Sequence, residues 1–377
     1  MPEDRALHQF IPTLDPGAVG AHTLEIQRTL RNAGWESEIF SEFTREHYSG
    51  LAHRFTDYGK TIPADDADIV VYHAAIGSSV ADWLMSRRPR RLVVDYHNIT
   101  PPVWFETWEP GLAYGLGWGR AQLRRLGRRA RFGMADSAYN ETELGQAGFR
   151  RTAVLPILVP PESLGGEPDA ELVERLRAGP GARWVFVGRI APNKRQHLLI
   201  AALSVYRRVY DPDARLFLVG GSSSVGYQEA LRRYAGDLGL DDAVVLTGSV
   251  NDAERNAYYA AGDVFVCASG HEGFCVPLLE AWQHQLPIVA VASSAVTETL
   301  GAAGLLLPST SPYNLAAAAA RVVGDPMLAD NLRAAGTSRL EEFSIDRTRQ
   351  RVLELADALA GGLADRPEVG AGRRSIP

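Results

Sequence analysis

The amino-acid sequence predicts an α/β protein built from two doubly wound domains, each with a parallel β-sheet covered by helices. Three observations support this fold class. The chain has 377 residues, more than one hydrophobic core usually supports. Short apolar runs alternate with helical segments in both halves, as in βαβ units. A stretch rich in proline, glycine and acidic residues, 160–171, separates the halves and is the predicted linker.

The first half contains a regular succession of apolar and amphipathic segments. Gly34 ends the first predicted helix, and Ser78 or Ser79 and Ser137 are the predicted N-caps of two later ones. In order, the predicted elements are a helix over 20–34, strands over 36–42 and 66–75, a helix over 78–87, a strand over 90–100, a short strand and a helix within 131–149, and a last apolar run over 151–160.

The second half repeats this rhythm. Strands are predicted over 183–190, 214–221, 243–250 and 263–269, with helices over 194–209, 226–240 and 252–262 between them. This order predicts domains over 1–160 and 161–345, a terminal helix over 346–362 that packs back on the first domain, and a frayed tail over 363–377. Ligands of such sheets bind outside the carboxyl ends of the strands, so the residues there are the first candidates for a functional site.

The composition excludes several classes of protein. The net charge of −6 argues against a nucleic-acid partner. No apolar run reaches the roughly 20 residues of a transmembrane helix, and the N-terminal residues are acidic where a signal peptide needs a basic start and an apolar core. The two cysteines, Cys267 and Cys275, cannot form a disulfide framework and have no metal-ligand cluster around them. The sequence therefore predicts a soluble, cytoplasmic protein.

The first candidate motif follows the strand that opens the second half. Gly188 stands at the strand outlet, and Arg189 and Lys194 flank a Pro-Asn turn before the next helix. The glycine allows close approach of a ligand to the backbone, and the two cations and the helix N-terminus suit a phosphate group. The alternative is a solvated turn with ordinary basic surface residues.

The second motif is "HEGFCVPLLE", residues 271–280. Pro277 suits the first turn of a helix, which puts Glu280 about one turn in and leaves Glu272 on the preceding loop. Carboxylates accept hydrogen bonds from vicinal hydroxyls, so two of them beside a phosphate site suggest a ligand with sugar hydroxyls at both ends. For Glu280 the alternative is a residue that stabilises the helix dipole.

Together the two motifs resemble a known family. "GRIAPNK" (188–194) followed by "HEGFCVPLLE" is similar to the signature of the retaining glycosyltransferases of family 4, which have the GT-B fold. That signature contains two glutamates separated by seven residues, the spacing of Glu272 and Glu280. Segments 17–40 and 291–308 also resemble the family, so the similarity covers most of the chain. It implies two Rossmann-like domains that face each other across a cleft, with the acceptor on the N-terminal side and the nucleotide sugar on the C-terminal side.

The resemblance also implies roles for individual residues. The cations matching Arg189 and Lys194 bind the donor diphosphate and stabilise the departing nucleotide. The first glutamate, Glu272, contacts hydroxyls of the transferred sugar, and the second, Glu280, binds the nucleotide ribose. From their positions alone, the backbone N–H groups of Phe274, Cys275 and Val276 beside the helix start could also hold an anion, and these residues, with Gly188 and Gly273, are the further candidate donor contacts.

The sequence departs from the family pattern at two places. Cys275 stands where the family has the last glycine of Glu-Gly-Phe-Gly, so a close backbone approach must tolerate a small side chain. The resemblance implies that the glycine-rich first loop contacts the donor phosphate or the acceptor. In this chain that loop reads Pro-Gly-Ala-Val-Gly, with Gly17 and Gly20 in place of a Gly-Gly pair.

Two histidines end predicted strands of the first half. His97 occupies the place where many members of the family carry a histidine near the 6-hydroxyl of the donor sugar, and His73 is its competitor. A histidine at a strand end is more often a structural, hydrogen-bonded residue. The resemblance implies catalysis without a metal or other cofactor, and the acids of 65–68 are interpreted as a solvated turn.

Aromatic residues and arginines gather between residues 100 and 133. Trp104 and Trp108 are candidate acceptor contacts, together with the nearby Tyr114 and Trp118, because aromatic rings stack on sugars. The arginines of 120–131 could attract a phosphate or contribute a weak peripheral contact with an anionic membrane. The alternative is a mobile lid followed by an ordinary cationic helix.

The predicted function is transfer of a hexose from a nucleotide-diphosphate sugar, most readily UDP- or GDP-linked, to a hydroxyl of a glycan, glycolipid or small molecule. No side chain is assigned as nucleophile, because in this family the leaving phosphate is thought to take the acceptor proton. Two alternatives stay open. One is a GT-B-fold nucleotide-sugar epimerase, which would turn over without an acceptor. The other is a non-catalytic nucleotide-sugar-binding subunit, which would be expected to lack the Arg/Lys pair or Glu272.

Overall fold

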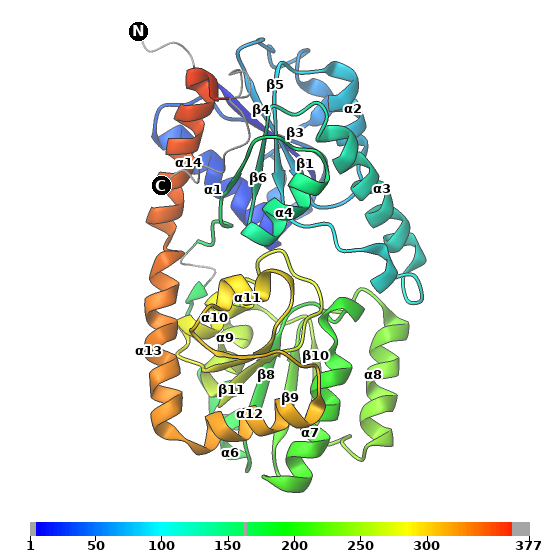
Figure 1. Ribbon diagram of the computed structural model, residues 1–377, viewed down its shortest axis with the longest axis vertical. Coiled ribbons are helices and arrows are strands. Elements are labelled where there is room, and N and C mark those ends of the chain that lie inside the picture. The colour runs from blue at the N-terminus through cyan, green and yellow to red at the C-terminus, as the bar shows by residue number, and fades with distance from the viewer. Residues whose placement is uncertain (1–4, 161–163, 364–377) are drawn as a thin grey trace. The chain divides into compact units, whose positions relative to one another are not determined.

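The computed structural model describes residues 5–160 and 164–363, which form two compact units (Figure 1). Of these residues, unit 1 contains 5–102, 111–160 and 343–363, and unit 2 contains 103–110 and 164–342. The predicted linker lies partly outside the described residues, and so does almost all of the predicted tail. The short segment 103–110 belongs to unit 2 although both of its neighbours along the chain belong to unit 1.

Unit 1 is a seven-stranded parallel sheet with the strand order β3-β2-β1-β4-β5-β6-β7. Its strands are β1 (Leu7–Leu14), β2 (Ile39–Thr44), β3 (His53–Arg54), β4 (Ile69–Ala74), β5 (Arg91–Tyr96), β6 (Phe132–Ala135) and β7 (Thr152–Val154). Its α-helices are α1 (Ala18–Asn32), α2 (Ser79–Arg87), α3 (Pro110–Leu126), α4 (Ala138–Gln146) and α14 (Ile345–Ala358), with short turns η1 (Glu46–Tyr48), η2 (Phe55–Asp57) and η5 (Leu359–Leu363).

Unit 2 is a six-stranded parallel sheet with the order β10-β9-β8-β11-β12-β13. Its strands are β8 (Arg183–Val187), β9 (Arg215–Val219), β10 (Val244–Gly248), β11 (Val264–Cys267), β12 (Ile288–Val291) and β13 (Leu305–Leu307). Its helices are α6 (Ala170–Ala178), α7 (Gln196–Val209), α8 (Val225–Asp237), α9 (Asp252–Ala261), α10 (Pro277–Gln283), α11 (Ser294–Leu300), α12 (Pro312–Gly324) and α13 (Pro326–Glu342), with turn η4 (Pro192–Lys194) at the end of the first loop and η3 (Pro102–Trp104) where segment 103–110 begins. Two doubly wound parallel sheets are the predicted fold class.

Local sequence signals explain where several helices begin. The hydroxyl of Ser78 accepts a hydrogen bond from the N–H of Ala81, and that of Ser137 from the N–H of Asn140, so both serines are N-caps. Asn251 and Glu254 form a capping box at the start of α9. Pro277 occupies the first turn of α10, as predicted, and Glu280 is the fourth residue of that helix. The helix α6 was not predicted; its N-cap Asp169 lies inside the predicted linker.

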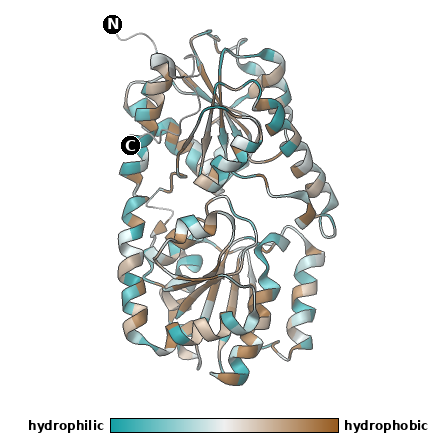
Figure 2. Cartoon of the chain, viewed as in Figure 1, coloured by the Kyte–Doolittle hydropathy of each residue, from teal (hydrophilic) through white to brown (hydrophobic). Residues whose placement is uncertain are grey.

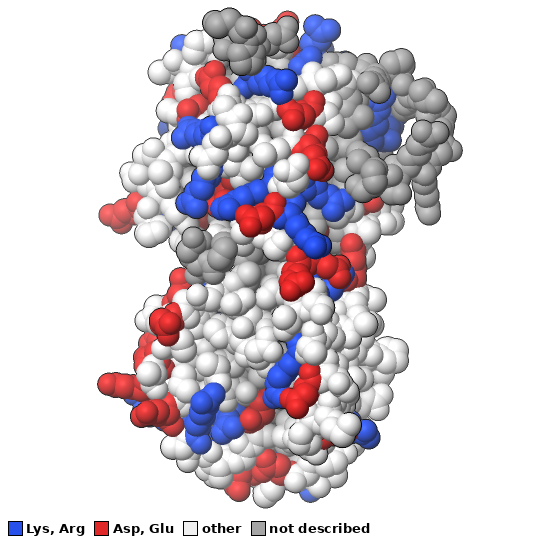
Figure 3. All heavy atoms as spheres, turned by 90° about the vertical axis from the view of Figure 1, so that its left-hand side faces the viewer, with Lys and Arg blue, Asp and Glu red and all other residues white. Residues whose placement is uncertain are grey.

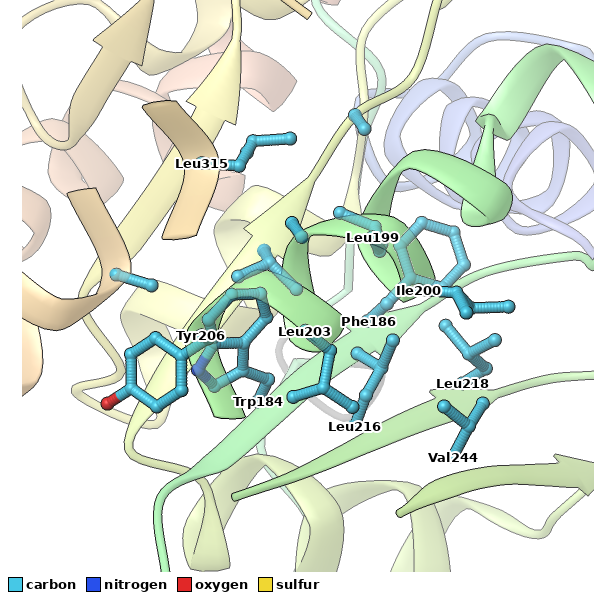
Figure 4. Close-up of a cluster of buried hydrophobic side chains, with 14 of the residues drawn as sticks. Trp184, Phe186, Leu199, Ile200, Leu203, Tyr206, Leu216, Leu218, Val244 and Leu315 are labelled. Atoms are coloured by element: carbon cyan, nitrogen blue, oxygen red, sulfur yellow. The ribbon is translucent and has the colours of Figure 1, made fainter. Parts of the chain in front are cut away.

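Each sheet is buried between layers of helices, and the strands are the most hydrophobic part of each unit (Figure 2). In unit 2 one large core cluster joins β8 and β9 to α7 and α12 (Figure 4). Its members include Trp184, Phe186, Leu203, Tyr206 and Leu216. Strands buried on both faces read as continuous apolar runs, which is why "RWVFV" and "RLFLV" identify them in the sequence.

The helix α14 belongs to unit 1 although it follows the last helix of unit 2 along the chain. It packs against α1, where the Arg349 guanidinium lies 2.6 Å from the Glu25 carboxylate. Arg5 and Asp357 form a second, exposed ion pair between the two ends of the unit. The chain thus returns to its first unit after building the second.

Candidate active site

The candidate site of unit 2 lies at the carboxyl ends of β8 and β11, which are neighbours in the sheet. From β8 the chain adds β9 and β10 on one side of the sheet and then β11, β12 and β13 on the other side. The boundary between β8 and β11 is therefore the point where the strand order reverses, and doubly wound sheets bind ligands at such a point. The loop after β8 carries Gly188, Arg189 and Lys194, and the loop after β11 carries Glu272. Packing of the sheet therefore brings together the two motifs that the sequence places far apart.

An ion pair joins the two loops. The Lys194 Nζ lies 2.5 Å from the Glu272 Oε1, and the Glu272 side chain is only 9% exposed. Burial disfavours the charged lysine, but the Glu272 carboxylate outweighs it, so the pKa of Lys194 is raised and the ammonium stays protonated. The N–H of Glu272 donates to the Ser294 hydroxyl at 2.8 Å, which fixes the glutamate's backbone.

Backbone contacts align the same two loops. The N–H of Gly270 donates to the Asn193 carbonyl at 2.7 Å, and the Asn193 side-chain amide donates to the His271 carbonyl at 3.1 Å. The first loop is also tied to α7, because the Gln196 amide donates to the Arg189 carbonyl. Arg189 itself is exposed at the strand outlet, with its guanidinium over the Phe105 ring at 5.9 Å.

Glu280 lies on α10, the helix that follows the β11 loop, and is 9% exposed. Its Oε2 accepts a hydrogen bond from the Tyr259 hydroxyl at 2.6 Å, and its Oε1 is 3.7 Å from the Arg255 Nε, too far for a hydrogen bond. Burial raises the pKa of Glu280, partly offset by Arg255 and Tyr259. These contacts hold the carboxylate in one orientation beside the β11 loop.

Cys275 has a φ of +78°, the left-handed region that glycine favours. The reason for the family's glycine here is therefore the backbone conformation as well as space, and a cysteine costs about 1–2 kcal/mol of strain. The side chain is 7% exposed, so it packs inward. Cys267, at the end of β11, is also buried, and both thiols are free.

In unit 1 the glycine-rich loop connects β1 to α1. Gly17 is the N-cap of α1, and its N–H donates to the Asp15 carboxylate. Gly20 lies in the first turn, where a Cβ would come within 2.0 Å of the Asp15 carbonyl oxygen. The segment therefore forms a tight loop and a helix start, in agreement with its interpretation as a glycine-rich first loop.

His97 follows β5 in a fully buried network. Its Nδ1 is 3.0 Å from the Asp136 carboxylate and its Nε2 is 2.9 Å from the His73 Nδ1. The Gln9 amide donates to the Thr23 carbonyl, so its oxygen faces the His73 Nε2, which must carry a proton. His73 Nδ1 is then an acceptor, and His97 donates from both nitrogens as an imidazolium.

The electrostatics agree with this assignment. Burial disfavours the charge, but Asp136 and Asp95 outweigh it and raise the pKa of His97 to about 9. Burial and the neighbouring histidines keep the pKa of His73 well below its ordinary value, although Asp95 opposes them. With its side chain 1% exposed and both nitrogens paired, His97 could reach a donor hydroxyl only by exchanging one of these hydrogen bonds.

The same cluster has the composition of a metal site. His22, His73, Asp95 and His97 place one potential ligand atom each within 4.8 Å of one another. The N–H of Leu158 donates to the His22 Nδ1, so the His22 proton lies on Nε2 and points at Asp95, 3.0 Å away. In this arrangement the Nε2 atoms of His22 and His97 both carry protons, so the four residues form a hydrogen-bond network, and a metal would have to displace these protons.

The aromatic residues of 100–133 separate into two groups. Trp104 and Trp108 lie in unit 2, and Tyr114 and Trp118 lie on α3 in unit 1. Trp104 stacks under the Arg195 guanidinium at 4.9 Å, and Trp108 meets the Tyr227 ring edge-on. Both rings line an open cleft of about 380 Å³ that also contains Pro192. A role in acceptor binding stays a prediction.

Several arginines of 120–131 have partners inside unit 1. Arg120 pairs with Glu143 and Arg125 with Asp82, and Arg129 donates to the Met85 carbonyl at the end of α2. Arg125 and Arg129 also line a cleft of about 430 Å³ with Arg88 and Arg128. On the surface of each unit that Figure 3 shows, basic and acidic side chains are interspersed. Membrane contact through the arginines stays a prediction.

Sequence reasoning missed the partners of the predicted residues. The side chains of His73 and His97 are held by Gln9, Asp95 and Asp136. In unit 2, Phe105 contacts the Arg189 guanidinium, and Arg195, the residue after Lys194, lies over the Trp104 ring. The two aspartates carry a signal that could have been used, because each lies at or just after the end of a buried strand. For Phe105 the sequence offers no such signal.

Comparison with solved structures identifies the fold. Sucrose-phosphate synthase from Thermosynechococcus elongatus superposes with a TM-score of 0.72 at 19% identity, covering 95% of this chain and 100% of that one. Anabaena HepE in complex with UDP and glucose superposes with a TM-score of 0.72 at 19% identity, covering 94% of this chain and 100% of that one. At this identity the likeness concerns the fold, which is that of the GT-B glycosyltransferases.

Sequence relatives identify the family. Residues 181–325 match the family described as "Glycosyl transferases group 1". The GDP-mannose-dependent alpha-(1-6)-phosphatidylinositol monomannoside mannosyltransferase of Mycolicibacterium smegmatis is 33% identical over 267 residues, which cover 65% of this chain and 68% of that enzyme. The D-inositol 3-phosphate glycosyltransferase of Acidothermus cellulolyticus is 23% identical, and the match covers 92% of this chain and 87% of that enzyme. The chain belongs to the group 1 glycosyl transferases, a family-4-type glycosyltransferase with the GT-B fold.

Across the described residues, every helix is too short or too polar to cross a membrane.

Proposed function

We propose that this glycosyltransferase uses a nucleotide-diphosphate sugar, UDP- or GDP-linked, and transfers its hexose with retention and without a metal. The acceptor is a hydroxyl of a glycan, a glycolipid or a small molecule. The observation that carries the proposal is the Lys194–Glu272 pair beside Arg189 at the β8–β11 outlet. The M. smegmatis relative is a GDP-mannose-dependent mannosyltransferase, which makes GDP-mannose the first donor to test.

The groups at the outlet suit a diphosphate. Arg189 and Lys194 supply two positive charges, which stabilise negative charge as it grows on the leaving diphosphate. The N–H groups of Cys275 and Val276 donate to no acceptor among the described residues, so two backbone donors are available to phosphate oxygens. Such preorganised donors are typically worth several kcal/mol in the transition state.

The two glutamates suit the two sugars of the donor. The Glu272 Oε1 accepts a hydrogen bond from Lys194, while its Oε2 accepts none from the described residues and is available to a hydroxyl of the transferred hexose. The Glu280 Oε2 accepts a hydrogen bond from the Tyr259 hydroxyl, and its Oε1, 3.7 Å from the Arg255 Nε, is available to the ribose. Because ribose is bound equally in ground and transition states, Glu280 contributes affinity rather than rate.

Retention follows from delivery of the acceptor to the face that the diphosphate leaves. The bond from the anomeric carbon to the phosphate oxygen breaks, the acceptor oxygen bonds to the same face, and its proton passes to the leaving phosphate. No side chain is needed as a base on the opposite face. An inverting enzyme would need one.

The test has two stages. Thermal unfolding with UDP, GDP, ADP and TDP sugars identifies the donor, since a ligand at a hundred times its Kd stabilises by about 2.7 kcal/mol. The product from an α-linked donor is then analysed by the one-bond carbon–proton coupling at its new anomeric centre. An α-linkage is expected, and a β-linkage refutes retention. Donor isomerisation without acceptor would indicate an epimerase, and binding without turnover a non-catalytic subunit.

A further inference from the structure

The segment 103–110 reaches unit 2 from a part of the chain otherwise devoted to unit 1. We propose that this segment completes the donor site: Phe105 and Trp104 are positioning residues that hold the guanidinium groups of Arg189 and Arg195 at the β8–β11 outlet. The inference rests on the proposed binding of a donor diphosphate at this outlet, and it adds residues that neither motif contains.

Phe105 supports Arg189 through a cation–π contact. The ring is fully buried, and the Arg189 Cζ lies 5.9 Å from its centroid. Arg189 forms no ion pair with any carboxylate among the described residues. A carboxylate partner would occupy the guanidinium N–H groups and offset its charge. An aromatic face holds the cation and leaves those N–H groups available to a phosphate.

Trp104 makes the same kind of cation–π contact with Arg195, at the end of the same loop. Its ring lies 4.9 Å from the Cζ of Arg195, which directly follows Lys194 and has a φ of +53°. A Cβ on Gly270 would lie 2.5 Å from the Trp104 ring and 2.7 Å from the Arg195 Cζ. The indole, the guanidinium and the Gly270 backbone are therefore in contact where the N–H of Gly270 binds the Asn193 carbonyl.

The rest of the segment is anchored to unit 2. The Ser224 hydroxyl donates to the Trp108 carbonyl at 3.3 Å, and the Ser223 hydroxyl donates to the Glu109 carboxylate at 2.8 Å. Trp108 packs edge-on against Tyr227 of α8, with ring centroids 5.2 Å apart. These contacts fix the segment at its far end, so Trp104 and Phe105 have a defined position against the two loops.

The test removes the π-face and keeps an apolar side chain. Phe105→Leu should lower the donor kcat/KM by about 2- to 30-fold, the range of cation–π contacts from exposed to desolvated sites. Phe217→Leu is the matched control: Phe217 is a similarly buried aromatic residue of unit 2 that packs on Tyr258 and touches neither cation. It should lose stability comparably in thermal unfolding and keep its kcat/KM within about twofold. An equal loss of kcat/KM in both variants would overturn the proposal.

A double-mutant cycle separates positioning from packing. If Phe105 acts through Arg189, then Phe105→Leu should change kcat/KM by less than about twofold in an Arg189→Ala background. The same fold-loss in both backgrounds would refute the positioning role. If Arg189→Ala alone leaves turnover intact, it is the proposed diphosphate site that fails. Trp104→Leu should likewise reduce kcat/KM in the wild type but not in an Arg195→Ala background, and Trp104→Phe should restore part of the loss.

Discussion

Replacement of Lys194 by alanine should reduce both turnover and stability, for separable reasons. The substitution leaves the Glu272 carboxylate, 9% exposed, without the ammonium that lies 2.5 Å from it. Breaking a fully buried ion pair costs about 3–5 kcal/mol, and an exposed pair is worth at most about 1. The Lys194 side chain is 18% exposed, so we expect a loss of about 2 kcal/mol in the free energy of unfolding. For a unit of this size that is about 4–8 °C in Tm.

Turnover should fall by roughly two orders of magnitude or more, because the ammonium stabilises charge that grows in the transition state. The double variant Lys194→Met, Glu272→Gln removes both charges and should regain most of the lost stability while remaining inactive. Calorimetry measures the first effect, and nucleotide release from the donor in the presence of acceptor measures the second. An unchanged Tm in Lys194→Ala would show that the pair is not a buried contact. Near-wild-type turnover would remove Lys194 from the donor site.

Three further predictions follow from the same geometry. Glu280→Gln should chiefly weaken binding of the free nucleoside diphosphate, measured by calorimetry, and unchanged affinity with lost transfer would mean that the roles of the two glutamates are reversed. EDTA should leave turnover unaffected, and loss that magnesium or manganese restores would contradict a metal-independent reaction. The pKa of His97, raised to about 9 from 6.5, contributes stability that is complete below pH 6.5 and is lost as the pH rises through 9. Urea unfolding should show this decline in the wild type and a flatter profile in His97→Gln; equal slopes would contradict the imidazolium assignment.

The sequence alone determined the fold class and the places where function could lie. Buried strands read as apolar runs and helices as amphipathic segments with recognisable caps, because these patterns depend on neighbours a few residues away. For the same reason the positions of Gly188, Arg189, Lys194 and Glu272 at strand outlets could be predicted. Pro277 and the helical position of Glu280 also follow from local rules.

The tertiary structure decided which side chains meet. Lys194 and Glu272 are 78 residues apart, and only the adjacency of β8 and β11 makes them an ion pair. The ring of His97 has its nitrogens occupied by Asp136 and His73, partners that come from two other strand ends. Phe105 belongs to the first half of the chain but contacts a cation of the second unit. Such pairings depend on the order of strands in the sheet and on where the chain crosses between units. Neither property produces a periodic pattern in the sequence from which it could be predicted.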